Sequence, residues 1–312
     1  MRALDVAREY YELYGRPLLE RDFAELCGRA AVGLCGEGSE CLGYDDELSR
    51  DHDLDVGFCI FLTAEDEERY GFRLQRAYDA LPQEFGGLKK GRYNPVGGRR
   101  RGVISIDDFY TRFLGSPKSP SSAEEWLSLP SHALLCASNG EVFSDPLGEF
   151  SAVRDVILAG YPEDVRRKKL AAHAVMMAQS GQYNYPRLLK RGELGGAQLA
   201  VYEFVRHAIS SIYLLNRRYE PFYKWAYRGL RDLPVLCALE SSLVALTELD
   251  NSKENAELKL GLIDDIAALF AQEYQRQGVS GSESRDLEAQ AITLQNTIGD
   301  VNIRNLHIMD GI

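Results

Sequence analysis

Short apolar runs separated by charged stretches fill the first 150 residues. The runs at 31–35 and 102–106 are typical of buried strands, and alternation of polar and apolar residues extends a third strand over 53–62. Asn139-Gly140 between two further apolar segments favours a hairpin of strands at 132–137 and 141–143. Helical spacing predicts further elements over 3–15, 18–30, 65–80 and 109–114. This part is therefore expected to be a small mixed β-sheet with helices.

The pattern changes near residue 150, after which helical segments follow one another to the end of the chain. Glycine and proline residues break these segments at 160–162, 186, 192, 221 and 234. We therefore predict an α+β protein with two domains, a small mixed β-sheet domain over 1–150 and an all-α helical bundle over 151–312.

Composition narrows the possible functions. The chain has 312 residues, 45% hydrophobic content and a formal net charge of -11, which argues against general nucleic-acid binding. No apolar stretch approaches the roughly 20 residues of a membrane span, and the charged N-terminus lacks a signal-peptide core. A cytoplasmic protein with no membrane partner is expected. The six scattered cysteines form no Cys-x-x-Cys pair, so a zinc site is not expected.

The most informative motif is Gly38-Ser39, followed twelve residues later by Asp51-His52-Asp53. On a strand, the period of two puts Asp51, Asp53 and Asp55 on one face. Carboxylates so spaced can hold a hard divalent cation such as Mg²⁺, and the backbone amides of a Gly-Ser turn can bind phosphate. A cation beside a phosphate site is the basic equipment for phosphoryl or nucleotidyl transfer.

This arrangement resembles the signature of the nucleotidyltransferase superfamily, which includes polymerase beta and the aminoglycoside nucleotidyltransferases. The resemblance implies that Gly38 and Ser39 bind the phosphates of a nucleoside triphosphate, while Asp51 and Asp53 are catalytic residues that hold Mg²⁺. The second half, with Tyr183-Asn184, Arg191-Gly192-Glu193 and the segment 214–225, is similar to the helical part of a bacterial family. In that family an uncharacterised helical domain follows a nucleotidyltransferase-like one.

Transfer to a hydroxyl also needs a base, and three carboxylates are candidates. Superfamily members place a third acid within a neighbouring strand, where this chain has Ser105. Asp107, just after that strand, is one candidate, although it equally suits the start of a helix. Asp55 shares the face of the aspartate pair, and Glu193 could be supplied by the helical half.

A glycine-rich segment between 88 and 101 holds the densest basic cluster of this acidic chain. Lys89 and Arg92 are candidates for steadying the phosphates of the nucleotide or for binding a polyanionic acceptor. The alternative is an ordinary solvated loop.

The expected function is Mg²⁺-dependent transfer of a nucleoside monophosphate, most simply AMP from ATP, to a hydroxyl of a small molecule, a protein or an RNA. The alternative is a catalytically degenerate relative that binds a nucleotide or a partner, such as a component of a toxin–antitoxin pair. The absence of an acid within the strand at 102–106 favours the alternative, and the intact Ser39, Asp51 and Asp53 favour the enzyme.

Overall fold

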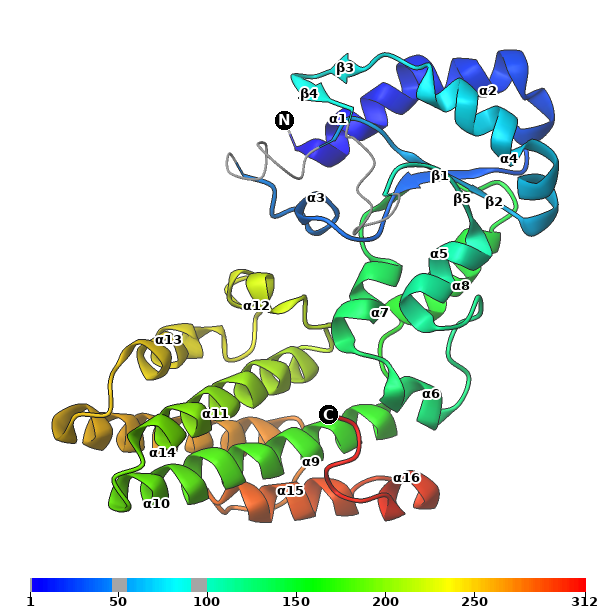
Figure 1. Ribbon diagram of the computed structural model, residues 1–312. Helices are drawn as coiled ribbons and strands as arrows, with labels where there is room; N and C mark the ends of the chain where they lie inside the picture. The colour runs from blue at the N-terminus through cyan, green and yellow to red at the C-terminus, as the bar shows by residue number, and fades with distance from the viewer. Residues whose placement is uncertain (1, 47–54, 91–99) are drawn as a thin grey trace. The chain divides into compact units, whose positions relative to one another are not determined.

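The computed structural model describes residues 2–46, 55–90 and 100–312 (Figure 1). The chain divides into two compact units. The first comprises Met1–Pro120 with Pro130–Ala159, and the second comprises Ser121–Leu129 with Gly160–Ile312. The first unit contains a small mixed sheet with helices and the second is helical, which confirms the predicted α+β fold class.

A four-stranded sheet in the order β5-β2-β1-β6 forms the centre of the first unit. Its strands are β1 (Ala31–Leu34), β2 (Cys59–Leu62), β5 (Gly102–Ser105) and β6 (Glu141–Ser144). β1 is antiparallel to β2 and to β6, whereas β2 and β5 run parallel. Gly33 is paired with Cys59, which is paired with Gly102. The end of β1 and the beginnings of β2, β5 and β6 therefore share one edge of the sheet.

Helices cover both faces of this sheet (Figure 1). Ile60 and Leu62 of β2 face a core that includes Tyr10 and Leu74, whereas Phe61 packs in the opposite direction against Phe109 and Phe150. A strand buried on both faces has no polar side chains to present, and β2 reads Cys-Ile-Phe-Leu accordingly. The first face is covered by α1 (Ala3–Tyr10), α2 (Arg16–Asp22) and α4 (Ala64–Asp79), and the second by α5 (Ile106–Leu114), α7 (Ser131–Ser138) and α8 (Glu149–Leu158).

Shorter elements complete this unit. They are a π-helical turn at Tyr11–Gly15 between α1 and α2, a 3₁₀ turn at Ala24–Leu26, α3 (Ser39–Leu42), and a two-stranded ribbon of β3 (Glu84–Phe85) and β4 (Leu88–Lys89). The strands predicted at 31–35 and 102–106 and the helix predicted at 65–80 are confirmed. The strand expected over 53–62 begins at Cys59 among the described residues, and α5 begins three residues earlier than expected.

The predicted hairpin at 132–143 is wrong in its first arm. Residues 131–138 form the helix α7, and β6 pairs with β1 instead. The segment is rich in alanine and leucine, which favour helix, and it contains no β-branched residue. Its buried residues Leu134, Ala137 and Ser138 fall at helical spacing. A short apolar run of this kind does not distinguish helix from strand by periodicity.

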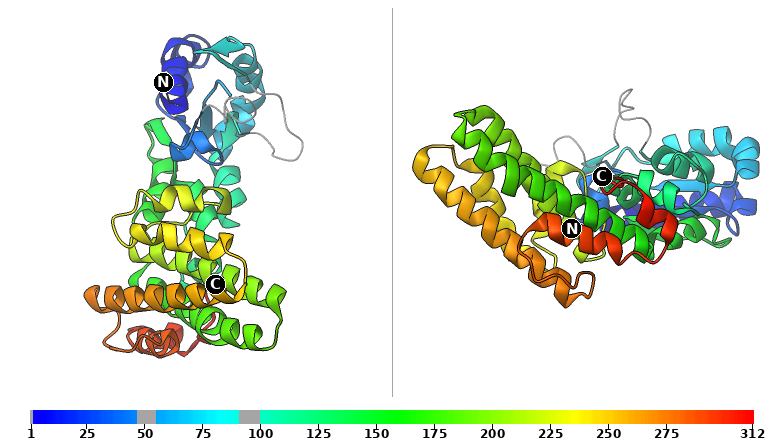
Figure 2. Two further views of the ribbon diagram at one scale, coloured as in Figure 1. Left: turned by 90° about the vertical axis from the view of Figure 1, so that its left-hand side faces the viewer. Right: turned by 90° about the horizontal axis from the view of Figure 1, so that it is seen from below.

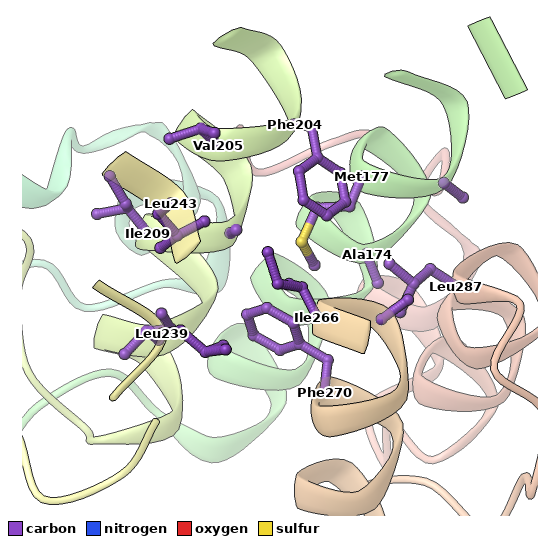
Figure 3. Packing of buried hydrophobic residues seen from close by; sticks show 14 of the residues in the cluster. Ala174, Met177, Phe204, Val205, Ile209, Leu239, Leu243, Ile266, Phe270 and Leu287 are labelled. Carbon is purple, nitrogen blue, oxygen red and sulfur yellow. The ribbon is translucent and has the colours of Figure 1, made fainter. Parts of the chain in front are cut away.

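The second unit is a bundle in which α9 (Glu163–Met177) packs against α11 (Leu194–Leu215) and α15 (Leu287–Asn296). Met177, Phe204, Ile266 and Phe270 meet in its core (Figure 3). Figure 2 shows the helices from two further sides. The others are α6 (Ala123–Ser128), a π-helical segment at Ala178–Asn184, α10 (Tyr185–Lys190), α12 (Tyr223–Leu230), a 3₁₀ turn at Cys237–Leu239, α13 (Glu240–Glu248), α14 (Lys253–Arg276) and α16 (Val301–Asn305). Within the described ranges, every helix is too short or too polar to cross a membrane.

Candidate functional site

The Gly-Ser turn, residues 36–43, follows the end of β1 and includes the single-turn helix α3. Gly38 has a φ of 127°, a backbone conformation that residues with a Cβ rarely adopt. The turn therefore lies at the sheet edge where β2, β5 and β6 begin.

The hydroxyl of Ser39 is buried and has no hydrogen-bond partner among the described residues. Only 3% of Ser39 is exposed to solvent. A buried polar atom without a partner is unusual in a native protein and calls for an explanation such as a missing ligand. A phosphate oxygen at the turn would supply the missing partner, so Gly38 and Ser39 fit the phosphate group that the sequence predicts.

Asn139 and Gly140 hold the turn from the other side of the sheet edge. The side-chain oxygen of Asn139 accepts a hydrogen bond from Gly36 N at 2.9 Å, and its amide nitrogen donates to Gly36 O at 2.7 Å. Gly140 N donates to Cys41 O at 3.0 Å. Gly140 has a φ of 69°, and any side chain there would overlap the carbonyl of Leu34. Sequence reasoning recognised this Asn-Gly pair but assigned it to a hairpin.

Arg101 and Glu40 form a buried ion pair at the turn. Arg101 Nη2 donates to Glu40 Oε1 at 2.5 Å, with 10% of the arginine side chain exposed and none of the glutamate side chain. Burial opposes the charge of Arg101, but the Glu40 carboxylate outweighs it and the pKa of Arg101 is raised. Glu40 Oε2 and Arg101 Nε have no partner within the described residues. This ion pair was not predicted from the sequence, although Glu40 directly follows Gly38-Ser39.

A pocket of 270 Å³ adjoins the turn at Gly36 and Glu37. Its other walls come mainly from β5 and α5, including Asp108 and Phe109. Arg112 Nη2 of α5 pairs with Glu37 Oε2 at 2.6 Å, which joins α5 to the turn. The pocket therefore offers both an aromatic ring and charged groups beside the turn.

The carboxylates proposed for catalysis are only partly within the described residues. Asp51 and Asp53 lie outside them, as does Arg92. No group of three metal-ligating side chains gathers in 2–46, 55–90 or 100–312. Asp55, two residues after Asp53, forms a parallel bridge with Lys89, and Val56 N donates to Lys89 O at 3.0 Å.

Asp107 lies in the first turn of α5 and is exposed. Ser105, at the strand position where the third acid was expected, is the N-cap of this helix and accepts a hydrogen bond from Asp108 N at 3.1 Å. Of the two aspartates, Asp108 is the one that lines the pocket. Glu193 belongs to the helical unit, where it is exposed at the N-cap position of α11.

The two described lysines of the basic segment have different surroundings. Lys89 is exposed and lies 3.4 Å from Glu84 across the β3–β4 ribbon. Lys90 donates to Tyr78 O at 2.6 Å and lies over the Tyr78 ring, where burial lowers its pKa. Lys89 therefore remains accessible to an anion, whereas Lys90 is engaged in holding the end of α4.

Comparisons with known proteins find a family model and a similar solved structure. Residues 126–226 match the model of a family described as a domain of unknown function (DUF4037). Among solved structures, the chain is similar to a nucleotidyltransferase-like protein from Exiguobacterium sibiricum, with 11% sequence identity and a TM-score of 0.39 over 91% of this chain and 89% of that one. No curated protein matches the sequence.

Proposed function

We propose that the protein is a Mg²⁺-dependent nucleotidyltransferase that transfers a nucleoside monophosphate, most simply AMP from ATP, to a hydroxyl group. The observation that carries this proposal is the Gly-Ser turn at the sheet edge, with its buried Ser39 hydroxyl that has no partner among the described residues. Asp55 follows the Asp51–Asp53 pair by two residues. Its backbone forms an isolated parallel β-bridge with Lys89, shortly before β2 begins at the same edge of the sheet. The motif residues are thus consistent with one phosphate-handling site.

In this function, the Ser39 hydroxyl donates a hydrogen bond to a phosphate oxygen of the triphosphate, and backbone N–H groups of the turn bind the phosphates. Asp51 and Asp53 supply the hard oxygen ligands that Mg²⁺ prefers, and the bound cation would neutralise charge on the triphosphate. Lys89 and Arg92 are proposed to steady the outer phosphates.

The reaction forms a bond between the acceptor oxygen and the α-phosphorus of ATP. It breaks the bond between the α-phosphorus and the oxygen that bridges to the β-phosphate, and the β- and γ-phosphates leave together as pyrophosphate. A carboxylate takes the proton of the acceptor hydroxyl. Asp107, Glu193 and Asp55 are the candidates from the sequence, and the pocket wall adds Asp108. The acceptor is a small molecule, a protein side chain or an RNA end, in a cytoplasmic setting without a membrane partner.

One observation favours the alternative of a nucleotide- or partner-binding protein without catalysis, such as a toxin–antitoxin component. β5 consists of Gly102, Val103, Ile104 and Ser105, so this strand supplies no carboxylate, and the Ser105 side chain is engaged in capping α5. In that case the turn would bind phosphates but no group in β5 would activate an acceptor.

The test is transfer of label from each α-labelled nucleoside triphosphate with Mg²⁺, with and without cell extract. We expect label on one acceptor fraction and loss of at least about 100-fold in the Asp51→Asn/Asp53→Asn double variant, because both metal ligands are weakened. Asp22→Asn, an exposed aspartate paired with Arg21, is the matched control and should retain full activity. Binding of ATP without any transfer would overturn the enzyme and favour the binding protein.

A further inference from the structure

We propose that Arg101, acting through Glu40, is a positioning residue for the Gly-Ser turn. The pair holds the turn in the form that leaves the Ser39 hydroxyl for a phosphate. The effect on nucleotides rests on the proposed function, whereas the effect on the turn itself does not.

The Glu40 side chain folds back over Gly38, so that a Cβ built on Gly38 would overlap both carboxylate oxygens of Glu40. Those oxygens are the far end of a flexible side chain, which is ordinarily free to move away. Here the carboxylate is fully buried and is held by Arg101. The position of the carboxylate over Gly38 is thus set by the arginine.

The Glu40 carboxylate also needs a neutralising charge. A buried carboxylate directly behind a phosphate-binding turn would repel the phosphates, because little solvent lies between the charges to screen them. Arg101 cancels this charge within the same buried space. The guanidinium therefore makes an acidic residue acceptable at the second position of α3.

Arg101 lies close to segments that adjoin three strands of the sheet. It immediately precedes β5, and its side chain lies against Gly57, where a built Cβ would come within 3.5 Å of the arginine Cγ. Gly57 precedes β2, and Glu40 lies beyond β1. One side chain therefore contacts or pairs with segments adjoining three strands at the edge where the turn lies.

The decisive variant is Glu40→Gln/Arg101→Met. The single change Arg101→Met leaves an unpaired buried carboxylate and can prevent folding, whereas neutral residues of similar volume in both positions are usually tolerated. The matched control is Arg29→Met, which breaks the part-buried ion pair with Asp66 in the same unit. Both variants lose one ion pair, but only the first loses the contact with the turn.

The first readout needs no nucleotide. Hydrogen exchange of the amides in residues 36–43, and alkylation of Cys41 located by mass spectrometry, report opening of the turn. Cys41 is buried in α3, and burial raises the pKa of its thiol. We expect alkylation of Cys41 and exchange of the turn to be at least about tenfold faster in the double variant, as expected for a loosened segment. The Arg29→Met control should stay near wild type.

The second readout is kinetic. We expect KM for ATP to rise about tenfold in the double variant with a smaller change in kcat, since the turn contacts phosphates that are bound before the reaction. Opening rates equal to those of the Arg29→Met control would overturn the positioning role, as would an unchanged KM in a loosened turn. A loosened turn in a protein that transfers no label would support the positioning role and overturn the proposed function alone.

Discussion

The Gly-Ser turn of the first unit and the buried face of α9 in the helical unit both hold polar groups away from water, but they satisfy them differently. Lys168 Nζ donates to Gln295 Oε1 and to the carbonyls of Leu306 and His307, at 2.6–3.2 Å. At the turn, Ser39 Oγ and Glu40 Oε2 have no partner within the described chain. Complete satisfaction is typical of a structural role, whereas a buried hydroxyl such as that of Ser39 calls for a further partner, which a ligand can supply.

The largest effect should come from α9. Changing Lys168 to Met removes the donor shared by three oxygen acceptors in a fully buried position. We expect the free energy of unfolding to fall by about 3 kcal/mol, because acceptors that lose a charged donor pay their desolvation cost. Urea denaturation measures this change, and exposed Lys190→Met should be nearly neutral. An unchanged stability would break the comparison.

Ser39→Ala sharpens the comparison, because it separates stability from activity. Removing a buried hydroxyl without a partner in the described part of the chain should change the free energy of unfolding by less than about 0.5 kcal/mol. The value of kcat/KM for ATP should fall about tenfold with the loss of the proposed phosphate hydrogen bond. The matched change is Ser180→Ala in the helical unit, where Ser180 Oγ donates to Met176 O at 2.6 Å. That variant should lose about 1 kcal/mol of stability and no activity. The reverse pattern would contradict the assignment of the turn.

The smallest effect is a pH dependence of stability that arises between α9 and α11. His173 of α9 and His207 of α11 face each other with 2.8 Å between their Nδ1 atoms. Burial, followed by the charge of Arg206, lowers the pKa of His207 from 6.5 to about 4. The folded protein thus binds fewer protons than the unfolded chain between these values, so this group makes stability fall as the pH is lowered from 6.5 to 4.

Glu220 acts in the opposite direction, since burial raises its pKa to about 7 and its contribution is lost as pH rises through that value. The measurement is therefore the difference between wild type and His207→Gln, taken by urea denaturation at several pH values. We expect the loss of stability toward pH 4 to be smaller in the variant. Equal slopes would show that His207 does not titrate between the two values.

Local signals in the sequence were sufficient for much of the first unit. The apolar runs of β1 and β5 were predicted correctly because their causes lie within a few residues. The alanine- and leucine-rich segment at 132–137 was assigned wrongly, since only its packing decides between helix and strand. The predicted roles of the site residues stay predictions, both those within the described ranges (Gly38, Ser39, Lys89, Asp107 and Glu193) and those outside them.

The groups that shape the turn could not be predicted from local pattern. Asn139 bonds Gly36 across 103 positions of the chain, and Arg101 pairs with Glu40 across 61. Asn-Gly is a frequent tight-turn dipeptide, and its second use, as a side-chain clamp on a distant glycine, leaves no periodic trace. Charged residues are ordinarily exposed, so nothing in the composition marked Glu40 as buried.

The reach of the Asn139 clamp also sets an order of events during synthesis of the chain. Gly38 and Ser39 leave the ribosome more than a hundred residues before β6 can pair with β1, a delay of roughly 5–20 s at ordinary elongation rates. Until then Gly36 lacks both hydrogen bonds with the Asn139 side chain, and β1 lacks its neighbour β6. The nascent chain therefore carries the Gly-Ser motif long before this motif can adopt its folded conformation.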